Sequence, residues 1–452
     1  MNKRKLIAIA TSIALVLIMV LTANATIAQA DRTFDCLNPK AEPGEARVIF
    51  TGTLDDAQDF YQQTMRSATL GNVEVAQYTD GLPIIIPTEE DVIEVLTGTS
   101  HSKTEVMSVY TKNTSGQWIQ GTSSTRFQPS GNTVTVEQVA VNAVMAGCKA
   151  EYLPAVLAMM SGGPNYVDEV YPIGYWQFVA GPFAKEVGFN TGQGAMNASN
   201  PPSMTIGRAF QLCLINLGGA IAGSTNANMG TLFNRSMLCL AEDPDDLPEG
   251  WVGANEDCGL EADESMIMLC QSSSMAQGNF APSSYRSMNS GHGGIANRLG
   301  AHGQPGFYNP IEYLMQLTVM PDKDQFEETV IAGGIVGPTG PLVIVGPPSC
   351  LEDLRLHGFA TKNEFYQWVE DRGAIPLSEY KKYGWYDAHT DFGLALEPKS
   401  GRPYMSLADD YPIHVLGTAD QQLIFPSIYP GDESLFAFSG GRGAVRSIDA
   451  WR

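Results

Sequence analysis

One cysteine stands where helix chemistry makes a thiol reactive. Cys148 follows Gly147, which ends an apolar helix predicted over 136–146, and we expect Cys148 to open the next helix. Thr135 and Gln138 have the spacing of a capping box at the start of the first helix. The unpaired N–H groups and the positive dipole end at a helix N-terminus lower the pKa of a thiol there. The sequence therefore predicts a reactive thiolate at Cys148, with a buried structural thiol as the alternative.

Three further residues are candidates for catalysis. Cys350 lies directly after an apolar strand, in the first turn of a predicted helix, and ligands of α/β sheets bind at such strand ends. His292 and His302 lie in one glycine-rich loop, and imidazole is the side chain best matched to proton transfer near neutral pH. We expect one of them to act as acid or base beside Cys148. The alternative is a loop in which both histidines are incidental.

A polar loop before the helix predicted over 206–217 has the composition of an anion site. Backbone N–H groups at a helix N-terminus, with an arginine in the first turn, would suit a small carboxylate. A P-loop is excluded, because the Gly-Lys-Ser/Thr sequence is absent at this helix start. A solvated arginine after an ordinary loop is the alternative. The residues assigned to substrate binding are Asn190, Thr191, Gly192, Thr205, which would cap the helix, and Arg208.

The N-terminus carries the pattern of an export signal. Basic residues at positions 3–5 precede an apolar run over 6–21, and Ala28-Gln29-Ala30 is a small-residue cleavage pattern. We therefore expect a signal peptide that is removed from a periplasmic or secreted protein. A retained membrane anchor is the alternative.

The charge of the chain limits the kinds of partner, and its cysteine content limits the disulfides. The chain has 49 acidic and 27 basic residues, so nucleic acid and, after signal cleavage, anionic membrane are unsuitable partners. Seven cysteines allow at most three disulfides within the chain, which leaves at least one free thiol or an intermolecular bond, and we expect Cys148 to be the free thiol. Cys239, Cys258 and Cys270 are close enough in sequence for one local bridge, whereas Cys213 lies in an apolar helix and should be buried. No metal or cofactor is predicted.

Strands and helices alternate along the chain, which predicts an α/β fold with parallel or mixed sheets flanked by helices. A strand over 175–180 is followed by Gly-Pro, a short helix and Gly-Phe, and the same order recurs from a strand over 342–345. This recurrence suggests two related α/β units. The predicted organisation is a signal peptide (1–30), an α+β region (31–133), a first α/β unit with Cys148 (134–240), an acidic and Gly/His-rich loop region (241–305) and a second α/β unit (306–452).

Two segments outside the repeat have recognisable patterns. The stretch over 242–264 holds ten acidic residues and no basic one, and its spacing does not fit a calcium loop, so we expect an exposed acidic loop. Near the N-terminus we expect a strand over 46–52, a helix over 54–67 and a helix over 89–96 that Thr88 caps.

Three stretches carry a resemblance to a known family. They are 80–98, 141–154 with the sequence VNAVMAGC at its start, and 205–219 with the sequence TIGRA at its start. Together they resemble a large bacterial family of poorly characterised proteins, some of which are fused to or encoded beside a small UGSC-type domain with selenocysteine or cysteine. The resemblance covers most of 80–380 and implies thiol or selenol chemistry. This chain departs from the family in its expected export signal and in having no Cys-Gly-Ser-Cys stretch, so either a UGSC-type partner is a separate protein or this protein works without one.

Taken together, these patterns favour an exported cysteine-dependent enzyme of the lyase, hydratase or hydrolase type. Its substrate would be a small organic molecule with an anionic or carbonyl group. A thiol oxidoreductase that uses Cys148 and Cys350 is one alternative. An extracytoplasmic binding protein, with a small molecule between the two α/β units, is the other.

Overall fold

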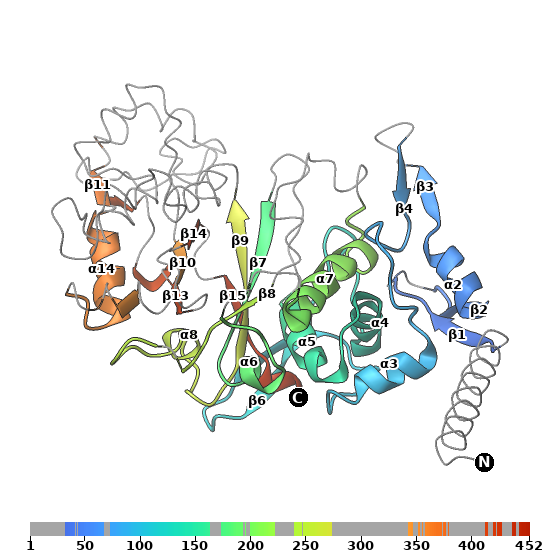
Figure 1. Ribbon diagram of the computed structural model, residues 1–452, viewed down its shortest axis with the longest axis horizontal. Coiled ribbons are helices and arrows are strands. Elements are labelled where there is room, and N and C mark those ends of the chain that lie inside the picture. The colour runs from blue at the N-terminus through green and yellow to red at the C-terminus, as the bar shows by residue number, and fades with distance from the viewer. Residues whose placement is uncertain are drawn as a thin grey trace, which may run out of the picture.

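A computed structural model places a mixed β-sheet at the centre of the protein, with helices on one side and a second set of strands on the other (Figure 1). The signal-peptide prediction lies outside the described residues. The structure describes residues 32–40, 42, 44–66, 73–162, 173–192, 195, 199–221, 239–245, 247–273, 342–346, 351–352, 355, 358–372, 374–376, 378, 412–414, 419–421, 423–426, 436–439 and 443–452.

The N-terminal region consists of two short helices and three antiparallel strand pairs. Helix α3 (Glu89–Leu96) begins as predicted, since the Thr88 side chain accepts the Asp91 N–H at 3.1 Å. Helix α2 (Leu54–Tyr61) is shorter than the predicted 54–67, because its buried face ends at Tyr61 and the chain continues as a strand. The pairs are β1 (Phe34–Leu37) with β2 (Val48–Gly52), β3 (Thr64–Arg66) with β4 (Glu74–Ala76), and β5 (Ser108–Lys112) with β6 (Trp118–Ser124).

A group of buried helices follows. The predicted capping box at the start of α4 is confirmed: Thr135 accepts the Gln138 N–H at 3.4 Å, and the Gln138 side chain accepts the Thr135 N–H at 2.9 Å. Asn216 donates to the Asn142 side chain at 2.8 Å and so links two of the helices in the core. The group comprises α4 (Val136–Ala146), the short η1 (Ala150–Tyr152), α5 (Leu153–Ser161), the one-turn α6 (Phe183–Glu186) and α7 (Pro201–Asn216).

The central sheet has the strand order β15-β9-β7-β8. β7 runs parallel to β8 and antiparallel to β9, which pairs antiparallel with β15. Val179 and Ile267 on one face belong to the core shared with the helices, while Phe178 on the other face belongs to a second buried cluster. The bounds are β7 (Ile173–Ala180), β8 (Cys239–Ala241), β9 (Met266–Ser273) and β15 (Ala444–Ser447).

A three-stranded sheet of order β13-β10-β14 covers that second face. β10 has one parallel neighbour, β13, and one antiparallel neighbour, β14, which is the pairing that β7 has with β8 and β9. Mixed sheets flanked by helices confirm the α/β fold class, and the repeated pairing favours the two related units. The bounds are β10 (Leu342–Gly346), β13 (Leu423–Pro426), β14 (Phe436–Ser439), β11 (Ala374–Pro376), β12 (Pro412–His414), α8 (Ala254–Asp257), α14 (Lys362–Arg372), η4 (Ala419–Gln421) and η5 (Asp449–Trp451).

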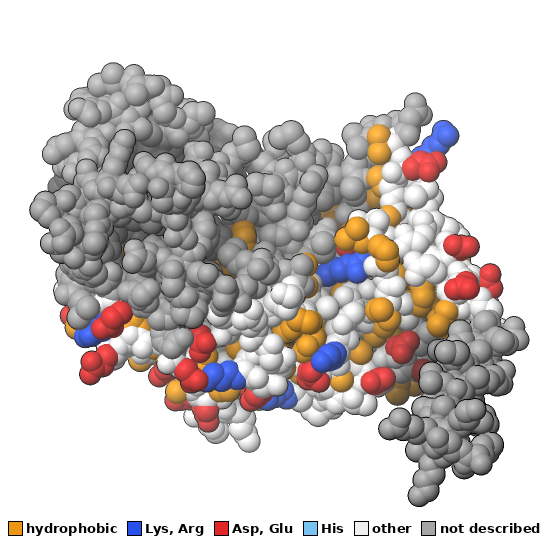
Figure 2. Space-filling model, viewed as in Figure 1, with side chains coloured by type: hydrophobic (Ala, Val, Ile, Leu, Met, Phe, Trp, Pro, Cys, Tyr) orange, Lys and Arg blue, Asp and Glu red, His pale blue; other side chains and the backbone are white. Residues whose placement is uncertain are grey.

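The described surface carries charged side chains of both signs along the lower edge of the view in Figure 2. Among the helices that the structure describes, none combines the length and the apolar character needed to cross a lipid bilayer.

Candidate functional site

Cys148 does not open a helix. Gly147 ends α4 in the left-handed conformation (φ 88°), and the Cys148 N–H donates back to Ala143 at 2.9 Å, so the thiol belongs to the final turn of α4. At that end the helix dipole is negative and does not favour a thiolate. Cys148 is 6 % exposed, and burial raises the pKa of its thiol to about 12, which the Thr205 hydroxyl beside it opposes weakly. The prediction of a low pKa was therefore wrong.

Two other buried thiols lie near Cys148. Burial raises the pKa of Cys213 and of Cys239, and the neighbouring Cys148 adds to both shifts. Cys213 is fully buried, as predicted. The predicted local bridge among Cys239, Cys258 and Cys270 does not form, because Cys239 and Cys270 are free thiols, as are Cys36, Cys148 and Cys213.

Arg208 is held by a carboxylate of the protein itself. Its Nε and Nη2 donate to the two oxygens of Asp80, each at 2.9 Å, in a bidentate pair. Because these two donors bind Asp80, they are not available to an anion from solution. Thr205 does not cap the helix, because α7 begins four residues earlier at Pro201, and the Thr205 hydroxyl donates to the Pro201 carbonyl at 2.9 Å.

The loop over 190–192 is closed by internal hydrogen bonds. Asn200 accepts the Asn190 N–H and donates to the Asn190 carbonyl, each at 3.0 Å. The Gly192 N–H donates to the Asn190 side chain at 3.1 Å, and the Thr191 hydroxyl donates to Asp243 at 2.6 Å. Two of the N–H groups expected to bind an anion are thus occupied. The predicted sites at His292, His302 and Cys350 lie outside the described residues.

Glu242, which is not among the predicted site residues, occupies the position where α/β folds place their ligands. Glu242 follows β8 directly, and its N–H donates to Val179 of the parallel strand β7 at 2.8 Å. The carboxyl ends of parallel strands meet at one edge of a sheet, and ligand sites lie beyond that edge. The side chain is fully buried, with the Ala254 N–H donating to its Oε1 at 3.0 Å and its Oε2 at 3.1 Å. Glu242 was expected in an exposed acidic loop, and that expectation was wrong for this residue.

A buried lysine, Lys362, lies on α14 and contacts α8, the helix that binds Glu242. Lys362, the first residue of α14, has a side chain that is 1 % exposed. Its Nζ donates to the Ile424 carbonyl of β13 and contacts the Asp257 carboxylate, both at 3.1 Å. The Tyr366 hydroxyl donates to Asp257 and accepts the Ile424 N–H, both at 3.0 Å. Lys362 and Tyr366 thereby bind the backbone C=O and N–H of Ile424 in β13, which is an edge strand of the three-stranded sheet.

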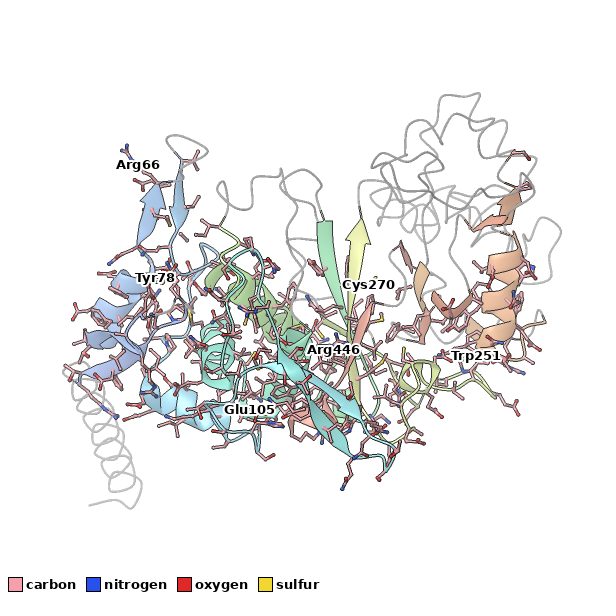
Figure 3. The ribbon with its side chains drawn as sticks, turned by 180° about the vertical axis from the view of Figure 1, so that it is seen from behind. Arg66, Tyr78, Glu105, Trp251, Cys270 and Arg446 are labelled. Carbon is pink, nitrogen blue, oxygen red and sulfur yellow. The ribbon has the colours of Figure 1, made fainter. Side chains whose placement is uncertain are left out.

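Figure 3 labels two residues, Trp251 and Cys270, whose contacts describe the surroundings of α8 and α14. Trp251, labelled there, lies close to α14, and its indole N–H donates to the Phe359 carbonyl at 3.2 Å. Cys270, also labelled, lies on β9 and belongs to the buried cluster between the two units. The residues Glu242, Asp257 and Lys362 therefore lie where α8 meets α14.

The surroundings of Glu242 set its acidity. Burial raises the pKa of Glu242 to about 7, and the nearby Lys362 ammonium is the largest opposing influence. The Ala254 N–H also favours the carboxylate, whereas Asp257 and Glu256 disfavour it. A carboxyl that gains and loses its proton near neutral pH can act as either acid or base at physiological pH.

Sequence reasoning missed this site for an identifiable reason. Glu242, which is buried, stands in a stretch of ten acidic residues over 242–264, and its residue type alone does not distinguish it from the others. A signal was present, because Glu242 follows the apolar stretch Cys239–Ala241 directly, at the end of a strand. For Lys362, nothing in the local sequence indicates that the side chain is buried, apart from its place at the start of a helix. In the described part of the chain, no group of histidine, cysteine and acidic residues is arranged to hold a metal ion.

Comparison with known proteins adds no relative: no family model, no curated protein and no solved structure matches this chain. The resemblance to the UGSC-associated family, and the separate UGSC-type partner that it implies, stay predictions.

Proposed function

We propose that this protein is an exported enzyme that moves a proton on a small carbonyl-containing acid, with Glu242 as the catalytic acid or base. The observation that carries the proposal is a fully buried carboxyl directly after the carboxyl end of β8, bound at the first N–H of α8, with the buried Lys362 ammonium paired to Asp257 at the last residue of that helix. Strongly perturbed carboxyl groups beside a specific charge partner cluster at functional sites.

The reaction class follows from the groups present. A carboxylate at the Glu242 position can remove a proton next to a carbonyl group and return it, which is the shared step of isomerases, lyases and hydratases. Lys362 has three N–H donors, and the described residues bind two of them, at Ile424 and Asp257. The third N–H is available to the negative charge that develops on the substrate oxygen.

This proposal replaces the cysteine mechanism with acid–base chemistry. A Cys148 thiol with a pKa of about 12 is protonated throughout the physiological range, and a thiol is a far weaker nucleophile than a thiolate. Cys148 then has a structural role at the end of α4. The export signal and the class of substrate are carried over from the sequence.

Hydrogen exchange in D₂O tests the proposal without knowledge of the natural substrate. The mature protein is incubated with a panel of 2-oxo acids, 3-oxo acids and hydroxy acids, and loss of C–H signals is followed by proton NMR. We expect at least one compound to exchange, with the rate reduced by about a hundredfold or more in E242Q and preserved in C148S. An equal rate in E242Q, loss of exchange in C148S, or no exchange with any compound would overturn the proposal.

The repeated strand pairing of the two units also favours a second candidate, a small-molecule binding protein. Binding without chemistry predicts that a compound of the same panel raises the unfolding temperature of the protein while its C–H signals persist in D₂O. The shared buried cluster between the units weighs against this candidate, because a hinge would have to expose it.

A further inference from the structure

We infer that Lys362 is a positioning residue for Glu242: α14, bound to β13 of the three-stranded sheet, supplies a buried ammonium that favours the carboxylate at the end of β8 in the central sheet, so the site is complete only when the two sheets pack together. This inference rests on the proposed function for the role of Glu242 in catalysis. The placement of the charges itself does not depend on that role.

The Lys362 ammonium is held in a fixed place close to the helix that binds Glu242. Lys362 and Glu242 are 120 positions apart in the chain, yet both are buried and bind the two ends of the four-residue helix α8: Glu242 accepts the N–H of its first residue, Ala254, and Lys362 contacts its last residue, Asp257. The Lys362 side chain is fixed at its end by the Ile424 carbonyl and by Asp257. A long flexible side chain held at two points keeps its charge in one place, so its effect on a neighbour is constant.

The charged groups around Glu242 influence whether its carboxyl ionises. Of the described groups that act on Glu242, Lys362 is the cation, while Asp257 and Glu256 of α8 are anions. A buried carboxylate without a nearby positive charge takes up a proton instead of ionising. Without Lys362, the two neighbouring anions and burial would together keep Glu242 protonated, and a protonated carboxyl cannot remove a proton from a substrate.

A purely structural role for Lys362 makes a different prediction. Tyr366 binds the same two partners as Lys362, namely Asp257 and the backbone of Ile424, and carries no charge. Replacing Tyr366 by Phe removes those hydrogen bonds and leaves the charges in place. Y366F is therefore the matched control that separates the packing of α14 on β13 from the electrostatic effect on Glu242.

The titration of Glu242 in the folded protein tests the inference. The mature protein is labelled with [5-¹³C]glutamate, the Glu242 signal is assigned by its absence in E242Q, and the midpoint is measured between about pH 4 and pH 10. In K362M we expect the midpoint to rise by at least about one unit, which is a tenfold weaker acid. K362R and Y366F should stay within about half a unit of the unsubstituted protein. An unshifted K362M, or equal shifts in K362M and Y366F, would overturn the inference.

A second comparison covers the case in which K362M does not fold. If Lys362 acts on Glu242, K362M/E242Q should be more stable than the sum of the two single effects predicts, because the buried Glu242 charge is gone while Asp257 keeps its hydrogen bond from Tyr366. A double variant as unstable as the sum of the two single variants would overturn the inference.

The titration is independent of the exchange assay, so the two failures are distinguishable. A midpoint that moves in K362M while no compound exchanges would retain the charge balance and remove the proposed function. Exchange that depends on Glu242 but is indifferent to K362M would retain the function and remove the positioning role.

Discussion

Phe178 of β7 stacks on Phe425 of β13, with the ring centroids 4.8 Å apart and the ring planes 26° from parallel. Both side chains are buried, at 0 % and 1 % exposed, in the cluster between the central sheet and the three-stranded sheet. The two strand sets thus share one hydrophobic core. We expect them to unfold together.

Removing one ring of this pair tests the shared core. Phe178→Ala should lower the free energy of unfolding by about 3–5 kcal/mol, because it leaves a cavity in a fully buried site. Chemical denaturation followed by circular dichroism should show one transition at lower denaturant concentration. Phe60→Ala, at a partly buried ring of the N-terminal region, is the control and should cost less. A separate early transition of the second unit in Phe178→Ala would contradict a common core.

The pH dependence of stability gives a second prediction. The pKa of Glu242 is about 7 in the folded protein and close to its ordinary value of 4.5 when unfolded, so the folded protein binds the proton more tightly. The contribution of Glu242 to the free energy of unfolding is therefore greatest below about pH 4.5, and it falls by about 3 kcal/mol as the pH rises to about 7. Glu242→Gln should remove this dependence and gain stability relative to the unsubstituted protein as the pH rises. Urea unfolding at several pH values measures it.

The control for that experiment lies in the same acidic stretch. Glu249 is exposed, and Glu249→Gln makes the same change of charge without burial. We expect its difference in stability from the unsubstituted protein to be nearly the same at every pH. If Glu249→Gln and Glu242→Gln behaved alike, a general effect of net charge would replace the buried carboxyl as the explanation.

Cys148 should be inert to alkylation in the folded state. Burial and a thiol pKa of about 12 both oppose reaction with iodoacetamide between pH 6 and 8. Mass spectrometry of tryptic peptides should find Cys148 unmodified in the native protein and modified in urea. Rapid labelling of the native protein at mildly acidic pH would restore the reactive thiolate that the sequence suggested.

Arg208 and Asp80 should depend on each other for stability. Breaking a partly buried, bidentate pair leaves one charge without its partner, so Arg208→Gln and Asp80→Asn should each cost about 1–3 kcal/mol. The double variant should cost less than the sum of the two, as measured by a double-mutant cycle in urea. Fully additive costs would show that the pair does not hold the loop at Asp80.

Much of the fold follows from local patterns. The strand ending at Ala180, the Gly-Pro turn after it and the helix α6 were predicted because alternating strand and turn signals are set by neighbouring residues. The caps at Thr88 and Thr135 were predicted for the same reason. The start of α7 was misplaced, because Pro201 is itself a favourable first helical residue and the helix begins there rather than after Thr205.

The site could not be predicted in the same way. The acidity of Cys148 and of Glu242 depends on burial and on neighbours that are distant in sequence, and neither is visible in a local pattern. Arg208 looked free for a ligand until the fold placed Asp80, 128 positions away, against it. Local sequence identified which residues could do chemistry, while tertiary contacts decided which of them are already occupied.

The pH profile of proton exchange tests the central claim most directly. With an exchanging compound in hand, the rate should rise with pH through a midpoint near the Glu242 pKa of about 7, because the carboxylate is the form that removes a proton. In Glu242→Gln that rise should be absent and the rate low at every pH. A profile that is flat between about pH 5 and pH 9, or one that keeps its midpoint in Glu242→Gln, would contradict the assignment of Glu242 as the catalytic group.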